Sequence, residues 1–262
     1  MTVRFERDGA RLLVTLDRPD RGNALRPSDM AALAEGLDEH RQAGARVAVF
    51  CGAGDRVFCG GYDLSELGAT RAEGDQPAAW ADRFPELVDA VAALRRWEGA
   101  TIAAVNGHAI GGGALMATLC DLRVGQVGAR FQIPASRIGV LYPLEGIRAL
   151  IATIGRGRAL EVLLLGDAVG AGDGRAWGLY NRVEEPGAVV DRALELADAL
   201  VARAPLALAG LSAMSRAVVD GWDERSVAEL HAEWTGRCVR SEDLVEGIAA
   251  ARERRVPRFV GK

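Results

Sequence analysis

The stretch Thr101-Ile-Ala-Ala-Val-Asn-Gly-His-Ala-Ile-Gly-Gly-Gly-Ala-Leu-Met-Ala-Thr-Leu-Cys120 decides the fold. It opens with the apolar run 101–105, passes through three consecutive glycines and continues as an apolar helical segment over 113–120. A strand, a glycine turn and a helix in this order are typical of α/β proteins. Backbone N–H groups at such a helix start favour an anion, because the helix dipole is positive there. No acidic side chain follows the turn, where the chain has Leu115.

Strands and helices alternate around this stretch in the first half of the chain. Apolar runs on either side of Asp8-Gly9 predict a hairpin, and Pro27-Ser28-Asp29 predicts a helix start with Ser28 as its N-cap. Further strands are expected at 46–51, 101–106, 122–124 and 129–131, and further helices at 79–97 and 113–120. The polar segment 68–77 is expected to be mobile. This alternation predicts α/β units with crossover connections.

Beyond about residue 143 the pattern is helical almost throughout. The expected helices cover 143–154, 157–165, 172–178, 187–203, 205–220, 223–237 and 241–254. We therefore divide the chain into an α/β core, residues 1–200, and a C-terminal helical region, residues 201–262. The apolar face of the helix 205–220 packs either on partner subunits or on the chain's own core.

Composition sets limits on function. The chain has 262 residues, 49% of them hydrophobic and 26% charged, with a net charge of −4. This acidic balance disfavours binding to nucleic acid, and no apolar stretch reaches the roughly 18 residues of a membrane helix. The N-terminus also has no signal-peptide pattern. From the charge and the length of the apolar stretches, we expect neither a nucleic-acid nor a membrane partner.

The chain offers few metal ligands and a single lysine. Its cysteines are expected to be buried free thiols in a reducing cytoplasm, because Cys51, Cys59, Cys120 and Cys238 show no C-x-x-C spacing. Three widely separated histidines make a zinc site improbable, and we expect no metal. The terminal Lys262 is the only lysine, which excludes a Walker A loop and an internal Schiff base.

Two glycine-containing loops follow neighbouring strands. Phe58-Cys-Gly-Gly-Tyr-Asp-Leu64 comes after the strand ending at Cys51, and Ala109-Ile-Gly-Gly-Gly-Ala114 after the strand ending at Asn106. In a parallel sheet, adjacent strand ends hold the ligand crevice. The two loops therefore predict converging backbone N–H groups, the outline of an oxyanion hole.

At this point the sequence resembles the crotonase family, the enoyl-CoA hydratase/isomerase superfamily. The two loops are similar to its two oxyanion segments, and other family segments follow in order along nearly the whole chain. These are Leu16-Asp-Arg-Pro-Asp-Arg-Gly-Asn-Ala-Leu25, Phe131-Gln-Ile-Pro134, Arg137-Ile-Gly139, Trp177-Gly-Leu-Tyr-Asn-Arg-Val183 and Pro257-Arg-Phe-Val-Gly261.

The resemblance implies a crotonase-like spiral of β-β-α units with a C-terminal helical trimerisation region, assembled as a homotrimer or a dimer of trimers. It also implies that two backbone N–H groups hold the carbonyl of an acyl-CoA thioester so that an enolate forms. Matched motif to motif, these donors are the amides of Tyr62 and Gly112. Tyr62 replaces a usually small residue, so its ring is expected to narrow the acyl pocket.

Members that hydrate enoyl thioesters use two glutamates around one water. The matching positions here are Leu115 and Ala135, and neither side chain transfers a proton. The resemblance therefore favours isomerase-type or other enolate chemistry over efficient hydration.

Glu145 is the remaining candidate acid/base, because some isomerases of the family place a lone carboxylate in this loop. The alternative is that Glu145 only sits in a first helical turn, favoured by the dipole. Tyr142 is a neighbouring donor candidate. Asp63 and Asp121 match positions that usually serve structure.

Coenzyme A, as part of the substrate, is the only cofactor that the resemblance implies. Arg21, Gly22, Ala24 and Leu25 match the segment that grips it, Gly60 belongs to the first oxyanion loop, and the basic tail with Lys262 either reaches the CoA phosphates or is a solvated helix end. Two classes of function stay open. The first is an enolate-stabilising enzyme, including a decarboxylase or C–C hydrolase, and the second is a catalytically silent acyl-CoA binder.

Overall fold

The computed structural model describes residues 2–63, 65 and 84–262. Its larger sheet has six strands in the order β1-β2-β3-β5-β7-β10. Their bounds are Val3–Asp8, Arg11–Leu16, Val47–Gly52, Ala100–Val105, Leu122–Gln126 and Arg182–Glu184. The β1–β2 hairpin is antiparallel and every other pair is parallel. The expected hairpin and crossover units are thus confirmed.

A second, four-stranded sheet stands beside the first. It has the order β4-β6-β8-β9, with bounds Val57–Cys59, His108–Ile110, Arg130–Gln132 and Val169–Gly170. β4, β6 and β8 are parallel and β9 is antiparallel to β8. The sequence predictions treated 57–59 and 108–110 as loop and missed β9 and β10 as well. Runs of two or three residues are too short to show a strand period.

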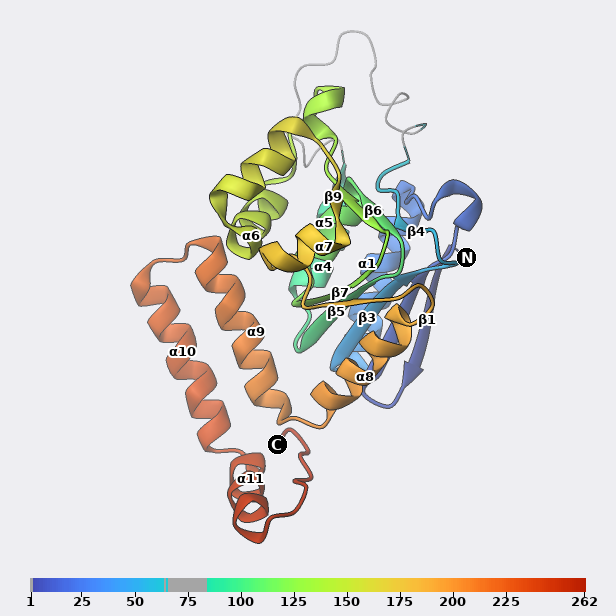
Figure 1. Ribbon diagram of the computed structural model, residues 1–262. Helices are drawn as coiled ribbons and strands as arrows, with labels where there is room; N and C mark the ends of the chain where they lie inside the picture. The colour runs from blue at the N-terminus through green and yellow to red at the C-terminus, as the bar shows by residue number, and fades with distance from the viewer. Residues whose placement is uncertain (1, 64, 66–83) are drawn as a thin grey trace.

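Helices cover both faces of the larger sheet. Alternate residues of β3, including Val47 and Val49, pack with β5 against α8 (Val189–Val201). The intervening residues, including Phe50, face the main core with α1 (Pro27–Gln42) and α4 (Pro85–Arg95). β3 and β5 are buried along their whole length, as strands covered on both faces must be. Figure 1 shows α8 and α1 on opposite sides of these strands.

Five other helical elements are α5 (Gly112–Leu119), α6 (Leu144–Leu165), α7 (Ala171–Trp177) and the short 3-10 helices η1 (Pro19–Arg21) and η2 (Ala135–Ile138). The two helices expected at 143–154 and 157–165 form the single element α6, interrupted by Gly155 with a positive φ of 77°. The helix predicted at 79–97 is described only from Pro85, and the segment 68–77 lies outside the described residues.

The predicted cap of the first long helix was wrong. α1 begins after Arg26, whose backbone N–H donates to the Asp29 carboxylate at 3.0 Å, while Ser28 is exposed within the first turn. Asp29 is buried and also accepts hydrogen bonds from Thr2 and the Arg26 guanidinium. A carboxylate that receives several donors at a helix start outcompetes a lone hydroxyl, and these hydrogen bonds lower the pKa of Asp29 despite its burial.

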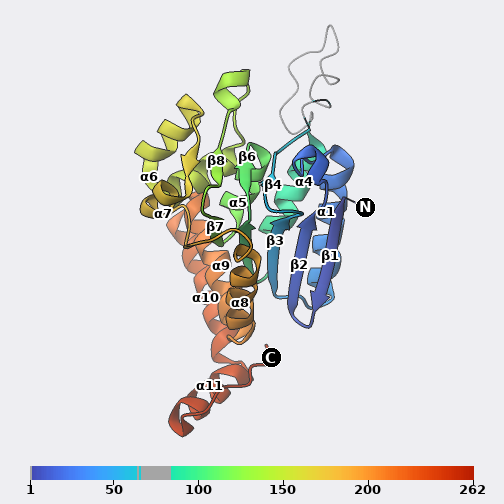
Figure 2. The same cartoon turned by 45° about the vertical axis from the view of Figure 1, so that its right-hand side comes forward.

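The C-terminal helices extend from the core. α9 (Pro205–Asp220) packs against α6 and β5, α10 (Glu224–Val239) runs along α9, and α11 (Glu242–Glu253) contacts α10. Figures 1 and 2 show α11 at the end of the molecule away from β6 and β8. Large apolar side chains stay exposed on these helices and their tail: Leu211, Val218, Trp222, Val239, Leu244, Val245, Ile248, Val256 and Val260. The division at residue 200 falls at the end of α8.

No single helix of the described residues is long and apolar enough to cross a membrane. α8 and α9 reach that length and composition only when taken together, across a bend of 113°.

All four cysteines are unpaired, and three of them are buried. Burial raises the pKa of Cys51, and it raises the pKa of Cys59 and of Cys120 to about 12. Because the thiolate is the reactive form, these three thiols will resist labelling in the folded protein. We expect one rapid equivalent with a thiol reagent, from Cys238, and four after denaturation. A Cys238→Ser variant should lose the rapid equivalent, and rapid native labelling of that variant would contradict the burial.

Candidate active site

The two glycine loops meet at backbone contact. A Cβ atom built on Gly61 would lie 2.7 Å from the Gly112 nitrogen, and one built on Gly112 would lie 3.3 Å from the Tyr62 nitrogen. Gly61 has a φ of +93°, a conformation that side chains rarely adopt. The loop after β4 and the start of α5 are therefore packed together without side chains between them.

Two separate physical constraints require glycine within the triplet 111–113. Gly111 caps α5 with φ 54° and ψ −110°, a left-handed conformation suited to glycine. Gly113 is close to β4, because a Cβ there would lie 2.1 Å from the Cys59 carbonyl oxygen. The turn thus needs glycine at Gly111 for its backbone angles and at Gly113 for its space.

The direction of the two N–H groups follows from the neighbouring hydrogen bonds. Leu25 pairs with this loop as a parallel bridge: its N–H donates to the Gly61 carbonyl at 2.8 Å, and its carbonyl accepts from the Asp63 N–H at 3.0 Å. The N–H of Tyr62 therefore points away from Leu25, toward the Gly112 side. Gly112 is the first residue of α5, where the N–H groups of a helix have no acceptor within the helix. Tyr62 and Gly112 both line the cavity described below.

The segment predicted to grip CoA is fixed beside this loop. The Gly60 N–H donates to the Gly22 carbonyl at 2.8 Å, and the Arg18 guanidinium donates to the Ala24 carbonyl at 3.1 Å. Asn23, buried with a positive φ of 53°, donates through its side-chain amide to the Val57 carbonyl at 2.6 Å. Arg21 is exposed at the end of η1. Sequence reasoning missed the roles of Arg18 and Asn23, although Asn is a residue that tolerates such a turn.

The two aspartates nearest the glycine loops serve the backbone. Asp63 accepts from the Ser65 hydroxyl and N–H and from Arg18, and these hydrogen bonds lower its pKa to about 2. Asp121 accepts from the N–H and hydroxyl of Thr101 at 2.7 and 2.8 Å. These contacts are the structural roles that the sequence predicted for both residues.

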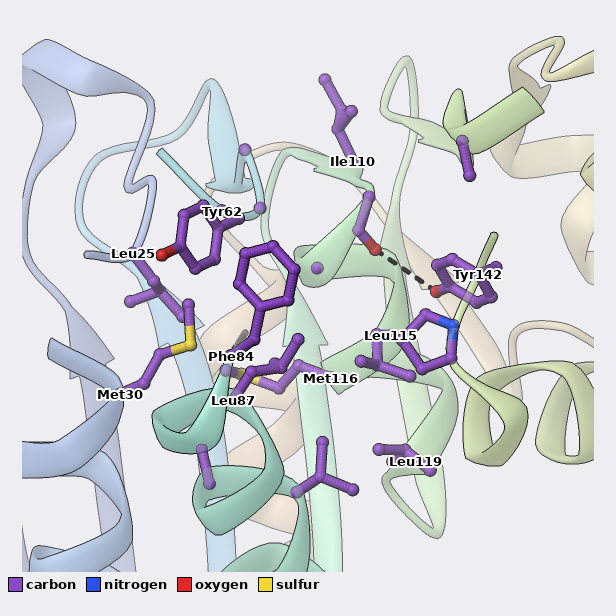
Figure 3. Close-up of a pocket in the computed structure, with 18 of the residues that line it drawn as sticks. Leu25, Met30, Tyr62, Phe84, Leu87, Ile110, Leu115, Met116, Leu119 and Tyr142 are labelled. Carbon is purple, nitrogen blue, oxygen red and sulfur yellow. Dashed lines mark hydrogen bonds between the residues drawn. The ribbon is translucent and has the colours of Figure 1, made fainter. Parts of the chain in front are cut away.

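A deep apolar cavity of about 210 Å³ opens beside the two amides (Figure 3). Leu25, Gly60, Tyr62 and Gly112 line it, as does Leu115, one turn into α5. The other lining residues come from α1, β3, α4, β6, α5, the segment 134–143 and the single residues Gly61, Phe84 and Gly111 next to these elements. Those within the elements and the segment are Met30, Leu33, Leu37, Phe50, Leu87, Ala90, Val91, Leu94, Ile110, Met116, Leu119, Pro134, Ala135, Ile138, Val140, Leu141, Tyr142 and Pro143.

No charged side chain lines this cavity within the described part of the chain. Its hydroxyl groups are those of Tyr62 and Tyr142. The Tyr62 ring lies beside Leu25 and meets Phe84 edge-to-face, with 5.2 Å between ring centroids (Figure 3). Tyr142 donates to the Gly111 carbonyl at 3.3 Å, and its burial strongly raises its pKa. The hydroxyl of Tyr142 is therefore a neutral hydrogen-bond donor at physiological pH, and not a base.

Leu115 fills the space next to Tyr142. A Cβ built on Gly146 would meet the Leu115 Cδ1 atom at 2.6 Å and the Tyr142 ring at 2.5 Å, so the two side chains pack together over this glycine. Ala135, at the start of η2, lines the same cavity as Leu115 and Tyr142.

Two of the predicted site residues, Glu145 and Lys262, do not line the cavity. Glu145 is half-buried in the first turn of α6 and does not line the cavity. Lys262 is exposed near α11, where its carbonyl accepts from the Glu242 N–H at 2.6 Å (Figure 1). Within one chain the basic tail therefore lies at the other end of the molecule from the amides. No cluster of three or more His, Cys, Asp or Glu side chains able to hold a metal occurs in the described ranges.

Comparison with known proteins fits this arrangement. Residues 6–262 match the family model described as enoyl-CoA hydratase/isomerase. The chain belongs to this family. Among curated relatives, (E)-benzylidenesuccinyl-CoA hydratase of Thauera aromatica is 34% identical over 272 residues, covering all of both chains. Carnitinyl-CoA dehydratase of Escherichia coli O157:H7 is 31% identical over 265 residues, covering 100% of this chain and 99% of the relative.

Solved structures confirm the predicted crotonase-like fold of this enoyl-CoA hydratase/isomerase family member. An enoyl-CoA hydratase from Polaromonas sp. JS666 superposes with a TM-score of 0.88 at 30% identity, over 98% of this chain and 99% of that one. An enoyl-CoA hydratase/carnitine racemase from Magnetospirillum magneticum gives 0.89 at 29% identity, over 100% and 96%. The family resemblance and the enzyme class predicted from the sequence are likewise confirmed.

The buried tyrosines give a pH prediction. Tyr142 and Tyr180 are two of the three tyrosines, and burial raises the pKa of each. A raised pKa means that the unfolded chain loses these protons first, so stability falls as pH rises above about 10. In a spectrophotometric titration near pH 11, we expect at most one of three tyrosines to ionise while the protein is folded. The other two should ionise together with the loss of the circular-dichroism signal. Ionisation of all three before unfolding would contradict this burial.

Proposed function

We propose that this chain binds an acyl-CoA thioester, holds its carbonyl oxygen with the amides of Tyr62 and Gly112, and stabilises the enolate without adding water efficiently. The proposal is carried by the close packing of the Tyr62 and Gly112 backbones at one cavity, which no charged side chain of the described residues lines. The segment Arg21–Leu25, fixed beside the same loop, supports CoA binding there.

The electrostatic reason is direct. When a proton leaves the carbon next to a thioester carbonyl, negative charge develops on the carbonyl oxygen. Two fixed N–H groups stabilise that charge most strongly where water is excluded, and one of them stands at a helix N-terminus. Such donors favour the transition state more than the neutral ground state.

The cavity wall disfavours hydration. Water must lose a proton as it attacks and the neighbouring carbon must gain one, which requires an acid and a base within reach. Leu115 and Ala135, at the positions that match the hydratase glutamates, both line the cavity and offer neither group. A double-bond shift needs only one group to take a proton and return it, and Glu145 is the candidate, two residues beyond the cavity wall at Pro143.

The second candidate is a silent acyl-CoA binder. It is favoured by the position of Glu145, which does not line the cavity. The two functions predict the same complex and differ only in turnover.

One experiment separates them. The protein is incubated with 2-enoyl-CoA and 3-enoyl-CoA, and thioester absorbance and products are followed together with binding by calorimetry. Interconversion of the two isomers that is lost in Glu145→Gln, and kept in Glu161→Gln on the exposed part of the same helix, supports the single-base enzyme. Tight binding without turnover supports the binder. Hydration at the rate of an efficient hydratase would overturn the proposal.

The exposed apolar side chains of α9, α10 and α11 support assembly as a homotrimer or a dimer of trimers, in which the basic tail of one subunit lies near a neighbour. Light scattering on the purified chain measures this state. Four unpaired thiols fit a reducing, cytoplasmic location.

A further inference from the structure

The inner end of the cavity reaches into the hydrophobic core. Its walls there are Leu33 and Leu37 from α1, Phe50 from β3 and Leu94 from α4. None of these side chains is more than 6% exposed. α1 and α4 pack against each other, so this end is closed and lies between them. Figure 3 shows Met30 and Leu87 on the way from Tyr62 and Phe84 toward it.

The closed end offers nothing to an ion. Every side chain of the described residues that lines it is a hydrocarbon, and the buried carboxylate on α1, Asp29, is already hydrogen-bonded to Arg26 and Thr2. Moving an ionised carboxylate or ammonium out of water into such surroundings is unfavourable unless a counter-charge is present. A methyl or methylene group gains free energy at the same place, because it leaves water.

The position of the thioester carbonyl determines which part of the ligand enters the cavity. With the thioester oxygen at the Tyr62 and Gly112 amides, the acyl carbons continue along the apolar wall while the CoA part leaves on the side of Arg21–Leu25.

Resting on the proposed thioester binding, we infer that the chain selects acyl-CoA ligands whose acyl group carries no charge. The far end of that group lies between α1 and α4, against Leu37, Phe50 and Leu94. The charge-free wall, and not chain length alone, sets this selection.

A matched ligand series tests the selection on the wild-type protein. Hexanoyl-CoA, adipoyl-CoA and the methyl ester of adipoyl-CoA share one carbon chain, and only adipoyl-CoA carries a terminal carboxylate. We expect calorimetry to show adipoyl-CoA binding about 100-fold or more weaker than hexanoyl-CoA, with the neutral ester within about tenfold of hexanoyl-CoA. Equal binding of hexanoyl-CoA and adipoyl-CoA would overturn the inference and leave the proposed function standing. Absence of binding by all three would overturn both.

A variant at the closed end tests the placement. Leu37→Phe shortens the cavity, whereas Leu37→Met keeps the side-chain volume and is the matched control. We expect Leu37→Phe to weaken the binding of hexanoyl-CoA by about tenfold or more and to leave the affinity for acetyl-CoA within about twofold of the wild-type value. In Leu37→Met, the affinities for the two ligands should not change differently. Equal effects on the two ligands in a folded Leu37→Phe protein would overturn the placement. If that variant does not fold, the ligand series on the wild-type protein still decides the selection.

Discussion

A Gly112→Pro variant will fold and will lose about 10²- to 10³-fold of any enolate-forming turnover. Gly112 is the first residue of α5, a position where proline is tolerated because the helix makes no use of that N–H. The residue before it, Gly111, has φ 54° and ψ −110°, which lies outside the α region that a following proline disfavours. The substitution therefore removes one of the two amide donors while leaving the helix start possible.

Gly112→Ala is the matched control, because it adds a carbon and keeps the N–H. Its Cβ would lie 3.2 Å from the Gly61 Cα atom, so the loop must move by a few tenths of an ångström. The carbonyl stretch of a bound acyl-CoA labelled with ¹³C at the thioester carbon provides a readout that does not depend on turnover. We expect the shift to lower frequency to shrink in Gly112→Pro and to persist in Gly112→Ala. An unchanged stretch and unchanged turnover in Gly112→Pro would remove Gly112 from the site.

Introducing both glutamates, as Leu115→Glu with Ala135→Glu, will raise the hydration of a short 2-enoyl-CoA by about 10²-fold or more over the wild-type protein. Both positions line the cavity that Tyr62 and Gly112 also line, and we expect the new carboxylates to hold one water between them. Each single variant should gain far less, since one group then lacks its partner.

The control pair places the first carboxylate one turn further along α5, as Leu119→Glu with Ala135→Glu. Burying a carboxylate at Leu115, which is only 2% exposed, will lower stability, so rates are compared per folded molecule from a denaturation curve. Equal gains in the two pairs, or a wild-type protein that already hydrates as fast, would show that the proton transfer depends on other groups.

The sequence predicted the parts of the fold that have a long period or a special residue. The strand 101–106, the glycine turn and the helix after it are present as β5, Gly111 and α5. Of the smaller sheet only β8 was predicted, as the strand 129–131; β4, β6 and β9 were missed, because strands of two or three residues are recognisable only once paired. The cap at Ser28 was wrong, because the choice between neighbouring polar residues depends on Arg26 and Thr2 reaching Asp29.

The candidate site, too, was predictable from the sequence only in part. Sequence motifs predicted the amides of Tyr62 and Gly112 and the replaced glutamates at Leu115 and Ala135, and all four residues line the cavity. They did not reveal the closed end of the cavity, because Leu33, Leu37 and Leu94 repeat as ordinary core leucines on helices. Only the packing of α1 against α4 leaves space between them. The position of Glu145 off the cavity also depends on where α6 starts, and helix starts are the least certain part of a pattern.

The contact between Gly113 and the Cys59 carbonyl has a consequence for how this protein can change over time. Any side chain at Gly113 collides with the backbone of β4, so a mutation there is removed by selection for folding alone. The amide half of the site is therefore inherited with the architecture, whatever reaction the protein performs. Positions 115 and 135 carry side chains on an existing cavity wall and are open to replacement. The fold thus keeps the backbone that we propose binds the thioester, while the side chains at positions 115 and 135 are free to change, so that two substitutions can restore or remove a reaction.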